Sequence, residues 1–336
     1  MRYIIYGAGA VGGVIGARLF QRGQDVALIA RGAHLDAIRR EGLTFQSSEG
    51  TEQLSIPAFG HPSEVEFAED DAVILAMKTQ DSAAALDELR AAAGGSIPVL
   101  CAQNGVENER LALRLFDRVY GVLVILPATH MEPGRVQANA SNKSGILDLG
   151  RYPSGSDAFA SAVADDWNGA DLSAQTSDAI MRWKYAKLLG NLGNAVQAAC
   201  GLKADTRDIY VRLRDEALAC YRAAGIDCAT ADEMRARREG VLSFDPAAGP
   251  QRGGGSSWQS LARGAGSIES EFLNGEIALL GRLHGVATPA NSTLQHIAAR
   301  LVREGASPGS VTPDEVRAEI SRAETEAPTA SGGLGR

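Results

Sequence analysis

The sequence is poor in aromatic residues, and it lacks any long apolar run. Phe, Trp and Tyr make up 5% of the 336 residues, so Ala, Leu, Val and Ile must supply most of the core packing. No apolar stretch reaches the length of a membrane-spanning helix, and no charged leader with a separate apolar stretch precedes the first predicted strand. We therefore expect a cytoplasmic protein with no membrane partner.

Cysteine is also scarce, and its spacing excludes two common uses. The four cysteines are Cys101, Cys200, Cys220 and Cys228, and no two of them form a CxxC pair. Because no His lies at ligand spacing from them, we expect neither a metal site nor a disulfide framework. Cys101 and Cys200 lie in apolar or Ala-rich segments and are interpreted as small core residues.

Positive charge is in deficit, since the formal net charge is -8. Such a surface repels the phosphate backbone, so we expect no nucleic acid partner. The nearest basic cluster, Arg235, Arg237 and Arg238, is short and lies beside Glu233 and Glu239. We interpret it as a solvated helix face.

The first half of the chain alternates short apolar runs with helical segments. A helix is expected at 11–22, and strands are expected at 1–6, 25–30, 72–77, 98–102 and 119–126, with one or two more in 134–149. This alternation predicts a parallel sheet covered by helices on both faces. The expected fold is α/β, with an N-terminal Rossmann-type doubly wound domain over residues 1–168.

From residue 158 onward the sequence consists of long segments with helical periodicity. Helices are expected at 179–199, 209–224, 268–284 and 312–323. The last begins with Thr312 at the N-cap, Pro313 at N1 and Glu315 at N3. We expect an all-helical domain over 169–326, with a Gly-rich loop at 246–257 and a disordered tail at 327–336.

A GxGxxG sequence follows the first predicted strand and opens the first predicted helix. Gly7 permits a tight turn, Gly9 lets a pyrophosphate approach the backbone, and Gly12 allows close helix packing. A glycine-rich structural turn is the alternative. We favour a dinucleotide site to which the whole motif contributes, namely Gly7, Ala8, Gly9, Ala10, Val11 and Gly12.

The end of the second strand indicates which dinucleotide binds. An NAD site commonly has a carboxylate there, which holds the ribose 2′-hydroxyl. This sequence instead ends the strand with Ala30, Arg31 and Gly32. Because a guanidinium suits a 2′-phosphate, we expect NADP (NADPH) with Arg31 as a cofactor contact.

Two further polar residues follow predicted strands of the same sheet. Lys78 comes after the run AVILAM, and Asn104 comes after PVLCAQ. Ligands of such sheets bind beyond the carboxyl ends of the strands. Lys78 is therefore a candidate cofactor contact and Asn104 a candidate cofactor and substrate contact, with a solvated Lys and an Asn-Gly turn as the alternatives.

The predicted helix 179–199 carries a polar stripe. Lys187, Asn191 and Asn194 are spaced i, i+4 and i+7, so they share one helix face. A substrate-facing stripe is favoured over a buried seam to another helix. Reduction of a ketone leaves an alkoxide that must be protonated, and a partly buried Lys with a lowered pKa can supply that proton while Asn side chains hold the carbonyl.

In order and spacing, these motifs are similar to those of the ketopantoate reductases. The shared segments are GAGAVG, MKTQ, AQNG, ATHMEPG, KLLGN and the late SS…IESEFLNGE block, and they run from Met1 to about Arg303. The resemblance implies a Rossmann domain followed by a helical domain resembling that of 6-phosphogluconate dehydrogenase. It also implies an active site between the two and NADPH-dependent reduction of 2-dehydropantoate to pantoate, on the pathway to coenzyme A.

The resemblance also implies roles for individual residues. Lys187 resembles the general acid, and Glu269 resembles a carboxylate that helps hold the substrate and cofactor and tunes the site. Ser257 resembles the hydroxyl that contacts the substrate carboxylate. Asn191 matches the first helix Asn of the family.

The sequence departs from the family pattern at the second helix Asn. That Asn lies eight residues after the Lys, where this chain has Ala195, and Asn194 comes one residue earlier. This departure leaves open a related reductase that acts on another 2-keto acid. A separate alternative is a non-catalytic NADPH-binding regulator, which would keep the Gly7–Gly12 loop and Arg31 but would need neither Lys187 nor Glu269. A hydroxyisobutyrate-type dehydrogenase is disfavoured, because 123–128 read LVILPA where that group has a DxPVSGG-like sequence. Monomer and homodimer both remain open.

Overall fold

The computed structural model describes residues 1–243, 254–264 and 266–326. The described residues form two compact units, one of residues 1–187 and 228–243 and one of residues 188–227, 254–264 and 266–326. The division falls inside helix α6 (Ile180–Asn191). It differs from the predicted domain limit at residue 168, because the first part of α6 packs its apolar side chains against the strands of the first unit.

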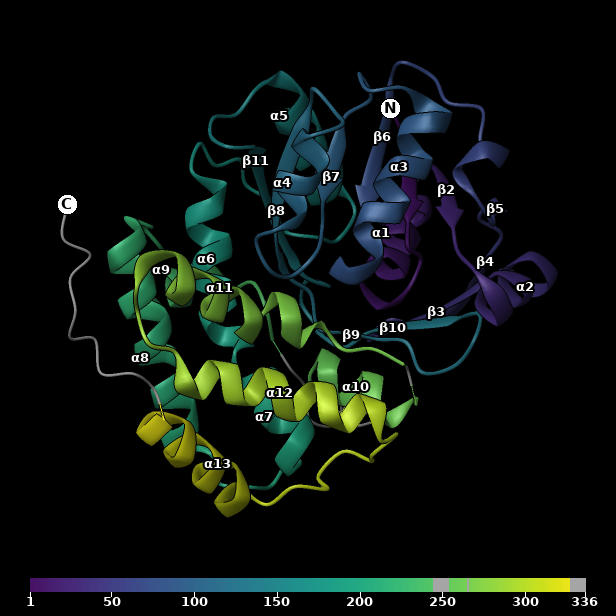
Figure 1. Ribbon diagram of the computed structural model, residues 1–336. Helices are drawn as coiled ribbons and strands as arrows, with labels where there is room; N and C mark the ends of the chain where they lie inside the picture. The colour runs from purple at the N-terminus through teal and green to yellow at the C-terminus, as the bar shows by residue number, and fades with distance from the viewer. Residues whose placement is uncertain (244–253, 265, 327–336) are drawn as a thin grey trace. The chain divides into compact units, whose positions relative to one another are not determined.

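The first unit contains a seven-stranded sheet in the order β11-β8-β7-β6-β1-β2-β5 (Figure 1). Neighbouring strands are parallel except β11, which is antiparallel to β8. The strands are β1 (Arg2–Tyr6), β2 (Asp25–Ile29), β5 (Ala58–Phe59), β6 (Asp71–Leu75), β7 (Val99–Cys101), β8 (Val119–Ile125) and β11 (Ile146–Arg151). The six parallel strands have the order of a dinucleotide-binding doubly wound sheet, which confirms the predicted fold class.

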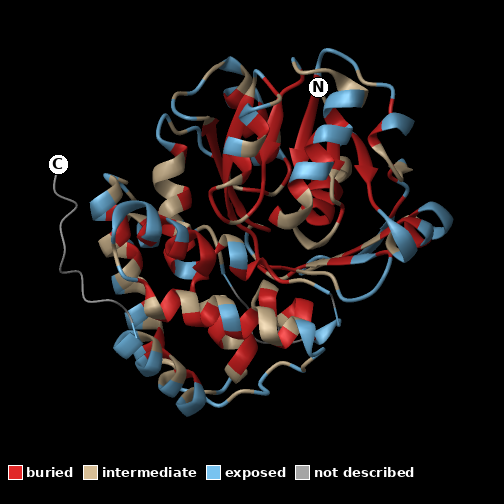
Figure 2. Cartoon of the chain, viewed as in Figure 1, coloured by how far each residue is buried: buried red, intermediate tan, exposed pale blue. Residues whose placement is uncertain are grey.

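Helices cover both faces of this sheet because side chains of successive strand residues point to opposite faces. In β1, Tyr3 and Ile5 join one apolar cluster, and Ile4 joins another. Figure 2 shows the strands as buried, while the helices around them alternate between buried and exposed residues. The helices of this unit are α1 (Ala10–Gln21), α2 (Gly32–Glu41), α3 (Ser82–Ala93), α4 (Asn108–Leu113), α5 (Ala158–Gly169) and α9 (Ala231–Arg238), with short 3-10 helices η1 (Pro62–Glu64) and η2 (Thr79–Asp81).

A second, four-stranded sheet in this unit was not predicted. Its order is β4-β3-β10-β9, and its strands are β3 (Leu43–Ser47), β4 (Gly50–Leu54), β9 (Ala128–Thr129) and β10 (Arg135–Ala138). Helix α1 lies close against it, since a Cβ on Gly13 would come within 2.7 Å of a methyl group of Val136. The predicted strands in 134–149 therefore belong to two different sheets.

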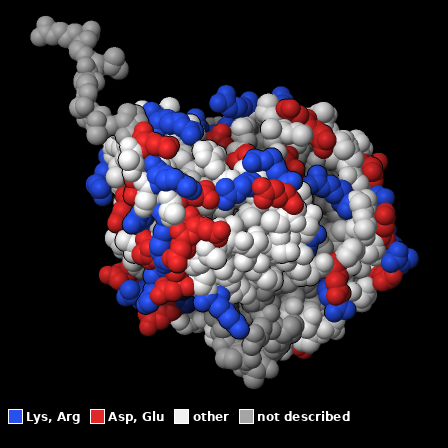
Figure 3. Space-filling view, turned by 60° about the horizontal axis from the view of Figure 1, so that its bottom comes forward, with Lys and Arg blue, Asp and Glu red and all other residues white. Residues whose placement is uncertain are grey.

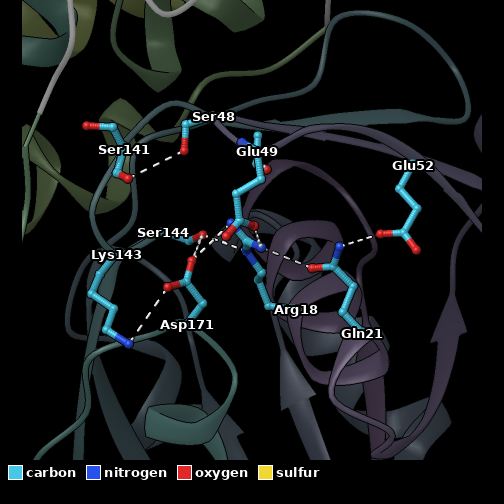
Figure 4. A network of polar contacts seen from close by, with 10 residues as sticks. Arg18, Gln21, Ser48, Glu49, Glu52, Ser141, Lys143, Ser144 and Asp171 are labelled. Carbon is cyan, nitrogen blue, oxygen red and sulfur yellow. Dashed lines mark hydrogen bonds and ion pairs between the residues drawn. The ribbon is translucent and has the colours of Figure 1, made fainter.

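A buried arginine of α1 ties the second sheet to distant loops (Figure 4). The Arg18 guanidinium pairs with Glu49 at 2.7 Å, in the turn between β3 and β4, and with Asp171 at 3.0 Å. It also donates to Ser144 Oγ at 2.8 Å. Because Arg18 is buried, these partners offset the cost of taking its charge out of water.

Helix α9 belongs to the first unit although it comes late in the chain. Arg237 donates to both carboxylate oxygens of Asp148 on β11, at 2.6 and 2.7 Å, and both side chains are buried. Arg182 likewise donates to Glu233. The prediction of a wholly solvated basic face is therefore wrong for Arg237. Its partner Asp148 lies on a distant strand, so the residues next to Arg237 in the sequence do not predict the pair.

The second unit is helical, and two of its predicted helices are interrupted. The predicted helix 179–199 breaks at Leu192, and the predicted helix 268–284 begins as a separate 3-10 turn. The elements of the second unit that follow α6 are α7 (Gly193–Cys200), α8 (Arg207–Ala224), α10 (Ser256–Ala262), η3 (Glu269–Phe272), α11 (Asn274–His284), α12 (Pro289–Arg303) and α13 (Pro313–Glu326). The predicted cap of α13 is confirmed, because Thr312 Oγ1 accepts from the Glu315 amide and the Glu315 carboxylate accepts from the Thr312 amide.

Several predictions concern segments at the limits of the described residues. Most of the Gly-rich loop and the tail at 327–336 lie outside them, and the described end of that loop, from Ser256, is helical.

All four cysteines are free, and Cys101 and Cys220 are buried while Cys200 and Cys228 are half-buried. Of the helices in the described part of the chain, none has the length and apolar character needed to cross a membrane. On the face in Figure 3, Lys and Arg lie interspersed with Asp and Glu.

Candidate active site

The glycine motif forms a tight turn between β1 and α1. Gly7 has φ of +102°, and a Cβ there would come within 2.6 Å of the Met77 amide nitrogen. A Cβ on Gly12 would meet Ala76 Cβ at 2.9 Å, whereas a Cβ on Gly9 would meet nothing within 4 Å. Gly9 is the N-cap of α1 and offers no capping side chain. The open backbone at a helix N-terminus fits a diphosphate.

Arg31 lies two residues after the end of β2 and is the N-cap residue of α2. Its side chain is 82% exposed, and its guanidinium donates to Asp81 Oδ2 at 2.7 Å. Asp81 ends η2, which follows β6. The exposed guanidinium suits a 2′-phosphate, but the phosphate would compete with a carboxylate that the sequence analysis did not identify.

Lys78 and Asn104 follow neighbouring strands, as predicted. Lys78 is the N-cap residue of η2 after β6, Asn104 follows β7, and β6 pairs with β7. Both residues make interactions with other parts of the protein. The sheet therefore brings the two residues to the same edge, at the carboxyl ends of parallel strands, where ligands of doubly wound sheets bind.

A buried hydrogen-bond network joins the loops that carry Lys78 and Asn104. Gln103 Nε2 donates to the Met77 carbonyl at 2.9 Å and to Ser82 Oγ at 2.8 Å. Ser82 Oγ donates to Asn108 Oδ1 at 2.7 Å, and Asn108 Nδ2 donates to Thr79 Oγ1 at 3.1 Å. Because buried polar groups are costly when unpaired, this network fixes the two loops relative to each other.

A buried ion pair anchors α6 to the same edge of the sheet. Lys184 Nζ lies 2.5 Å from Glu109 Oε1, and the two side chains are 2% and 0% exposed. Lys184 also donates to the carbonyls of Gln103 at 3.0 Å and Cys101 at 3.3 Å. Burial raises the pKa of Glu109, and the Lys184 ammonium opposes that rise. Neither residue was predicted from the sequence as part of the site, although Lys184 lies three residues before Lys187 in a predicted helix.

The predicted polar stripe is only partly on one helix. Lys187 and Asn191 both belong to α6, four residues apart, so they lie one turn apart along it. Asn194 instead lies in the first turn of α7, because α6 ends at Asn191 and Leu192 interrupts the helix. Leu192 nevertheless keeps helical dihedral angles (φ −59°, ψ −27°), and its amide donates to the Leu188 carbonyl at 3.2 Å, so the shared face of Lys187 and Asn194 stays a prediction.

Asn194 contacts the start of α10, which carries Ser257. Asn194 Nδ2 lies 3.5 Å from Ser256 Oγ, and Gln197 accepts from the Gly255 amide. Ser257 is buried, and its Oγ has no hydrogen-bond partner among the described residues. A buried hydroxyl without a partner marks a place where a ligand oxygen can bind.

Glu269 begins the 3-10 turn η3 rather than a helix. Glu269 is 8% exposed and interacts with other parts of the protein. Asn274 follows at the start of α11, where its Nδ2 donates to the Leu192 carbonyl and to Asn291 Oδ1. Asn274 therefore ties α11 to the break between α6 and α7, a contact that the sequence did not predict.

The sheet order and the open glycine turn define a Rossmann-type dinucleotide-binding protein with a helical second unit. The family described as Ketopantoate reductase PanE/ApbA matches residues 3–154, and the one described as Ketopantoate reductase PanE/ApbA C terminal matches residues 179–302. The chain belongs to the ketopantoate reductase family, which confirms the resemblance found in the sequence.

Relatives of known name agree with this assignment. A 2-dehydropantoate 2-reductase from Pyrococcus horikoshii is 34% identical over 191 residues, which cover 57% of this chain and 61% of that relative. A PanE/ApbA family ketopantoate reductase from Ralstonia eutropha JMP134 has a TM-score of 0.75 and 28% identity, covering 91% of this chain and 99% of its own. A D-mandelate dehydrogenase solved with NADH and anilino(oxo)acetate has a TM-score of 0.78 at 24% identity, with coverage of 91% and 99%, and shares the fold.

Proposed function

We propose that the protein reduces a 2-keto acid with NADPH, and that the keto acid is 2-dehydropantoate, which becomes pantoate. The observation that carries this proposal is the anchoring of α6 by the Lys184–Glu109 pair at the carboxyl end of β7. Lys187 follows one turn later on the same helix. The reaction is assigned to the cytoplasm, on the pathway to coenzyme A, with the chain acting as a monomer or a homodimer.

The residues of the first unit fit NADPH. The open Gly9 backbone at the N-terminus of α1 accommodates the diphosphate, and Gly7, Ala8, Ala10, Val11 and Gly12 shape that turn. Arg31 binds the 2′-phosphate, with Lys78 and Asn104 as further contacts at the strand ends. When bound, NADPH supplies the hydride that reduces the ketone.

Lys187 is the proposed general acid. Its ammonium donates a proton to the oxygen of the former ketone as negative charge develops there. Asn191 and Asn104 orient that oxygen by hydrogen bonding, which stabilises the charge in the transition state. After proton transfer, neutral Lys187 regains a proton from solvent before the next turnover.

The second unit supplies the proposed substrate contacts. Ser257 Oγ donates to the substrate carboxylate, which gives its buried hydroxyl a partner. Glu269 accepts from a substrate hydroxyl and from the cofactor ribose. Asn194 contributes through the start of α10, where it approaches Ser256.

A second candidate is the same reaction on a different 2-keto acid. The observation that favours it is the position of Asn194, which lies in α7 and approaches Ser256 while Ala195 occupies the family's Asn position. A one-residue shift turns a helical side chain by about 100°. The substrate pocket of this chain can therefore select a keto acid with a different side chain.

The test follows the loss of NADPH absorbance with 2-dehydropantoate, beside NADH and a panel of other 2-keto acids that includes an aryl one. Highest kcat/KM for 2-dehydropantoate with NADPH supports the first proposal. Higher kcat/KM for another keto acid selects the second. Tight NADPH binding without turnover of any 2-keto acid contradicts both.

A further inference from the structure

His34 lies between the glycine turn and a loop of the second sheet. It is the third residue of α2, three positions after Arg31. Its Nε2 lies 2.7 Å from the Ala8 carbonyl oxygen, and the Gly134 amide donates to its Nδ1 at 2.8 Å. Ala8 belongs to the glycine turn, and Gly134 precedes β10. The imidazole therefore bridges two segments that are distant in sequence.

Only one protonation state of the His34 imidazole is compatible with both contacts. An amide N–H donates only to an unprotonated ring nitrogen, so Nδ1 carries no proton. A carbonyl accepts only from a protonated nitrogen, so Nε2 carries the hydrogen. His34 is thus the neutral Nε2–H tautomer, and burial lowers the pKa of its ring. The His130 ring packs against it, with the two centroids 4.3 Å apart.

The Ala8 carbonyl matters because it shares a peptide group with the Gly9 amide. In a planar trans peptide the C=O and N–H bonds point in opposite directions. A bond that holds the Ala8 carbonyl toward His34 therefore turns the Gly9 N–H away from His34. The opposite end of the turn is held separately, since the Gly7 and Ala8 amides donate to the Ile29 carbonyl at 3.0 and 3.3 Å.

We propose that His34 is a positioning residue for the cofactor, which fixes the Ala8–Gly9 peptide so that the Gly9 amide faces the diphosphate. Gly9 is the residue of the turn whose Cα faces open space. Without the imidazole bond, the peptide can rotate before the cofactor binds, and ordering it then reduces affinity. This role rests on the proposed use of NADPH, and it acts on cofactor binding rather than on the chemical step.

Two amide substitutions separate the two contacts of His34. In His34→Gln the side-chain nitrogen can reach the Nε2 position and donate to the Ala8 carbonyl. In His34→Asn the side-chain oxygen takes the Nδ1 position and accepts from the Gly134 amide, while the bond to Ala8 is lost. His34→Ala loses both contacts.

The measurement is the Kd of NADPH for the full chain and its three variants, together with kcat at saturating NADPH. We expect H34Q to bind within about twofold of the wild type, and H34N and H34A to bind roughly five- to tenfold more weakly, as the loss of one hydrogen bond implies. The kcat of all three stays within about twofold. Equal weakening by H34Q and H34N, or no weakening by H34N, overturns the proposal.

A measurement on the wild type covers the case in which a variant fails to fold. With 15N-labelled histidine, NMR of the full chain reports which ring nitrogen of His34 carries the proton. The Nε2–H tautomer is expected, and the Nδ1–H tautomer or a charged ring at neutral pH overturns the inference. Failure of the wild type to bind NADPH instead contradicts the proposed function, so the two failures are distinguishable.

Discussion

Lys187 is the residue on which the proposed chemistry depends most. Its family motif, KLLGN, lies at the end of α6, where the helix passes from the first unit to the second. If its ammonium protonates the substrate oxygen, the side chain stabilises the transition state much more than it stabilises bound NADPH.

Replacement of Lys187 by Ala should lower kcat by about 10²- to 10⁴-fold, the usual contribution of a general acid, and change the Kd of NADPH by less than about twofold. Steady-state kinetics and fluorescence titration measure the two quantities. The exposed Lys203 provides a matched control, and Lys203→Ala should change neither. Comparable losses of kcat and NADPH affinity in Lys187→Ala would contradict the acid role.

Arg31 and Asp81 together set the proposed preference for NADPH over NADH. The Arg31 guanidinium is exposed, so its pair with Asp81 is stabilised weakly, and a 2′-phosphate can displace the carboxylate. Arg31→Ala should raise the Kd of NADPH about tenfold or more and leave that of NADH nearly unchanged. Asp81→Asn should tighten NADPH binding by roughly twofold, because it removes the competing charge. Parallel changes for both dinucleotides would show that Arg31 does not contact the 2′-phosphate.

At the scale of elements, α6 is held to the sheet by charge as well as by apolar packing. Lys184 and Glu109 are both buried, and no water is available to solvate either charge if the other is removed. Removing one partner of such a pair is therefore much more destabilising than replacing both by apolar residues.

Lys184→Met should lower the free energy of unfolding by about 3–5 kcal/mol, and the double variant Lys184→Met/Glu109→Leu should recover most of that loss. Denaturant midpoints of the full chain provide the comparison. The exposed Arg235–Asp232 pair is the matched control, and Arg235→Met should change stability by less than about 1 kcal/mol. A double variant as unstable as the single one would mean that packing, rather than the unpaired charge, explains the loss.

At the scale of the whole molecule, the two units differ in what they contribute to cofactor binding. The glycine turn, Arg31 and His34 all belong to the first unit, which also includes α9. A ligand that binds only the folded protein stabilises it by mass action.

NADPH at about 100 times its Kd should therefore stabilise the first unit by about 2.7 kcal/mol and raise its unfolding temperature. Calorimetry of the full chain, with hydrogen exchange to follow the two units, measures this effect. The gain in protection from hydrogen exchange should be greatest for the amides of residues 7–13 and 130–136, because His34 hydrogen-bonds to Ala8 in the first segment and to Gly134 in the second. Arg31→Ala at the same NADPH concentration should show a smaller gain, and an equal gain would count against its proposed contact.

Local patterns were sufficient for the sheet and for much of the candidate site. The strands around Gly7, Lys78 and Asn104 are short apolar runs bounded by turn residues, and parallel pairing brings their ends to one edge. The hairpin of β3 and β4 was missed although Leu43 and Phe45 alternate with polar residues before the Ser48-Glu49 turn. The interruption at Leu192 also had a local signal, since Asn191 and Gly193 on either side of it are poor helix residues.

The sequence by itself determined the family, the doubly wound sheet and the presence of a dinucleotide motif, because each of these is recognised from short segments whose residues are close together in the chain. Only the tertiary structure decided the partners of buried charges, namely Glu109 for Lys184, Asp148 for Arg237 and Glu49 and Asp171 for Arg18. It also decided that His34 bridges Ala8 and Gly134. The physical reason is that a buried polar group must pair with whatever group the fold brings close to it. That group can be far away in the sequence, so sequence spacing does not predict it.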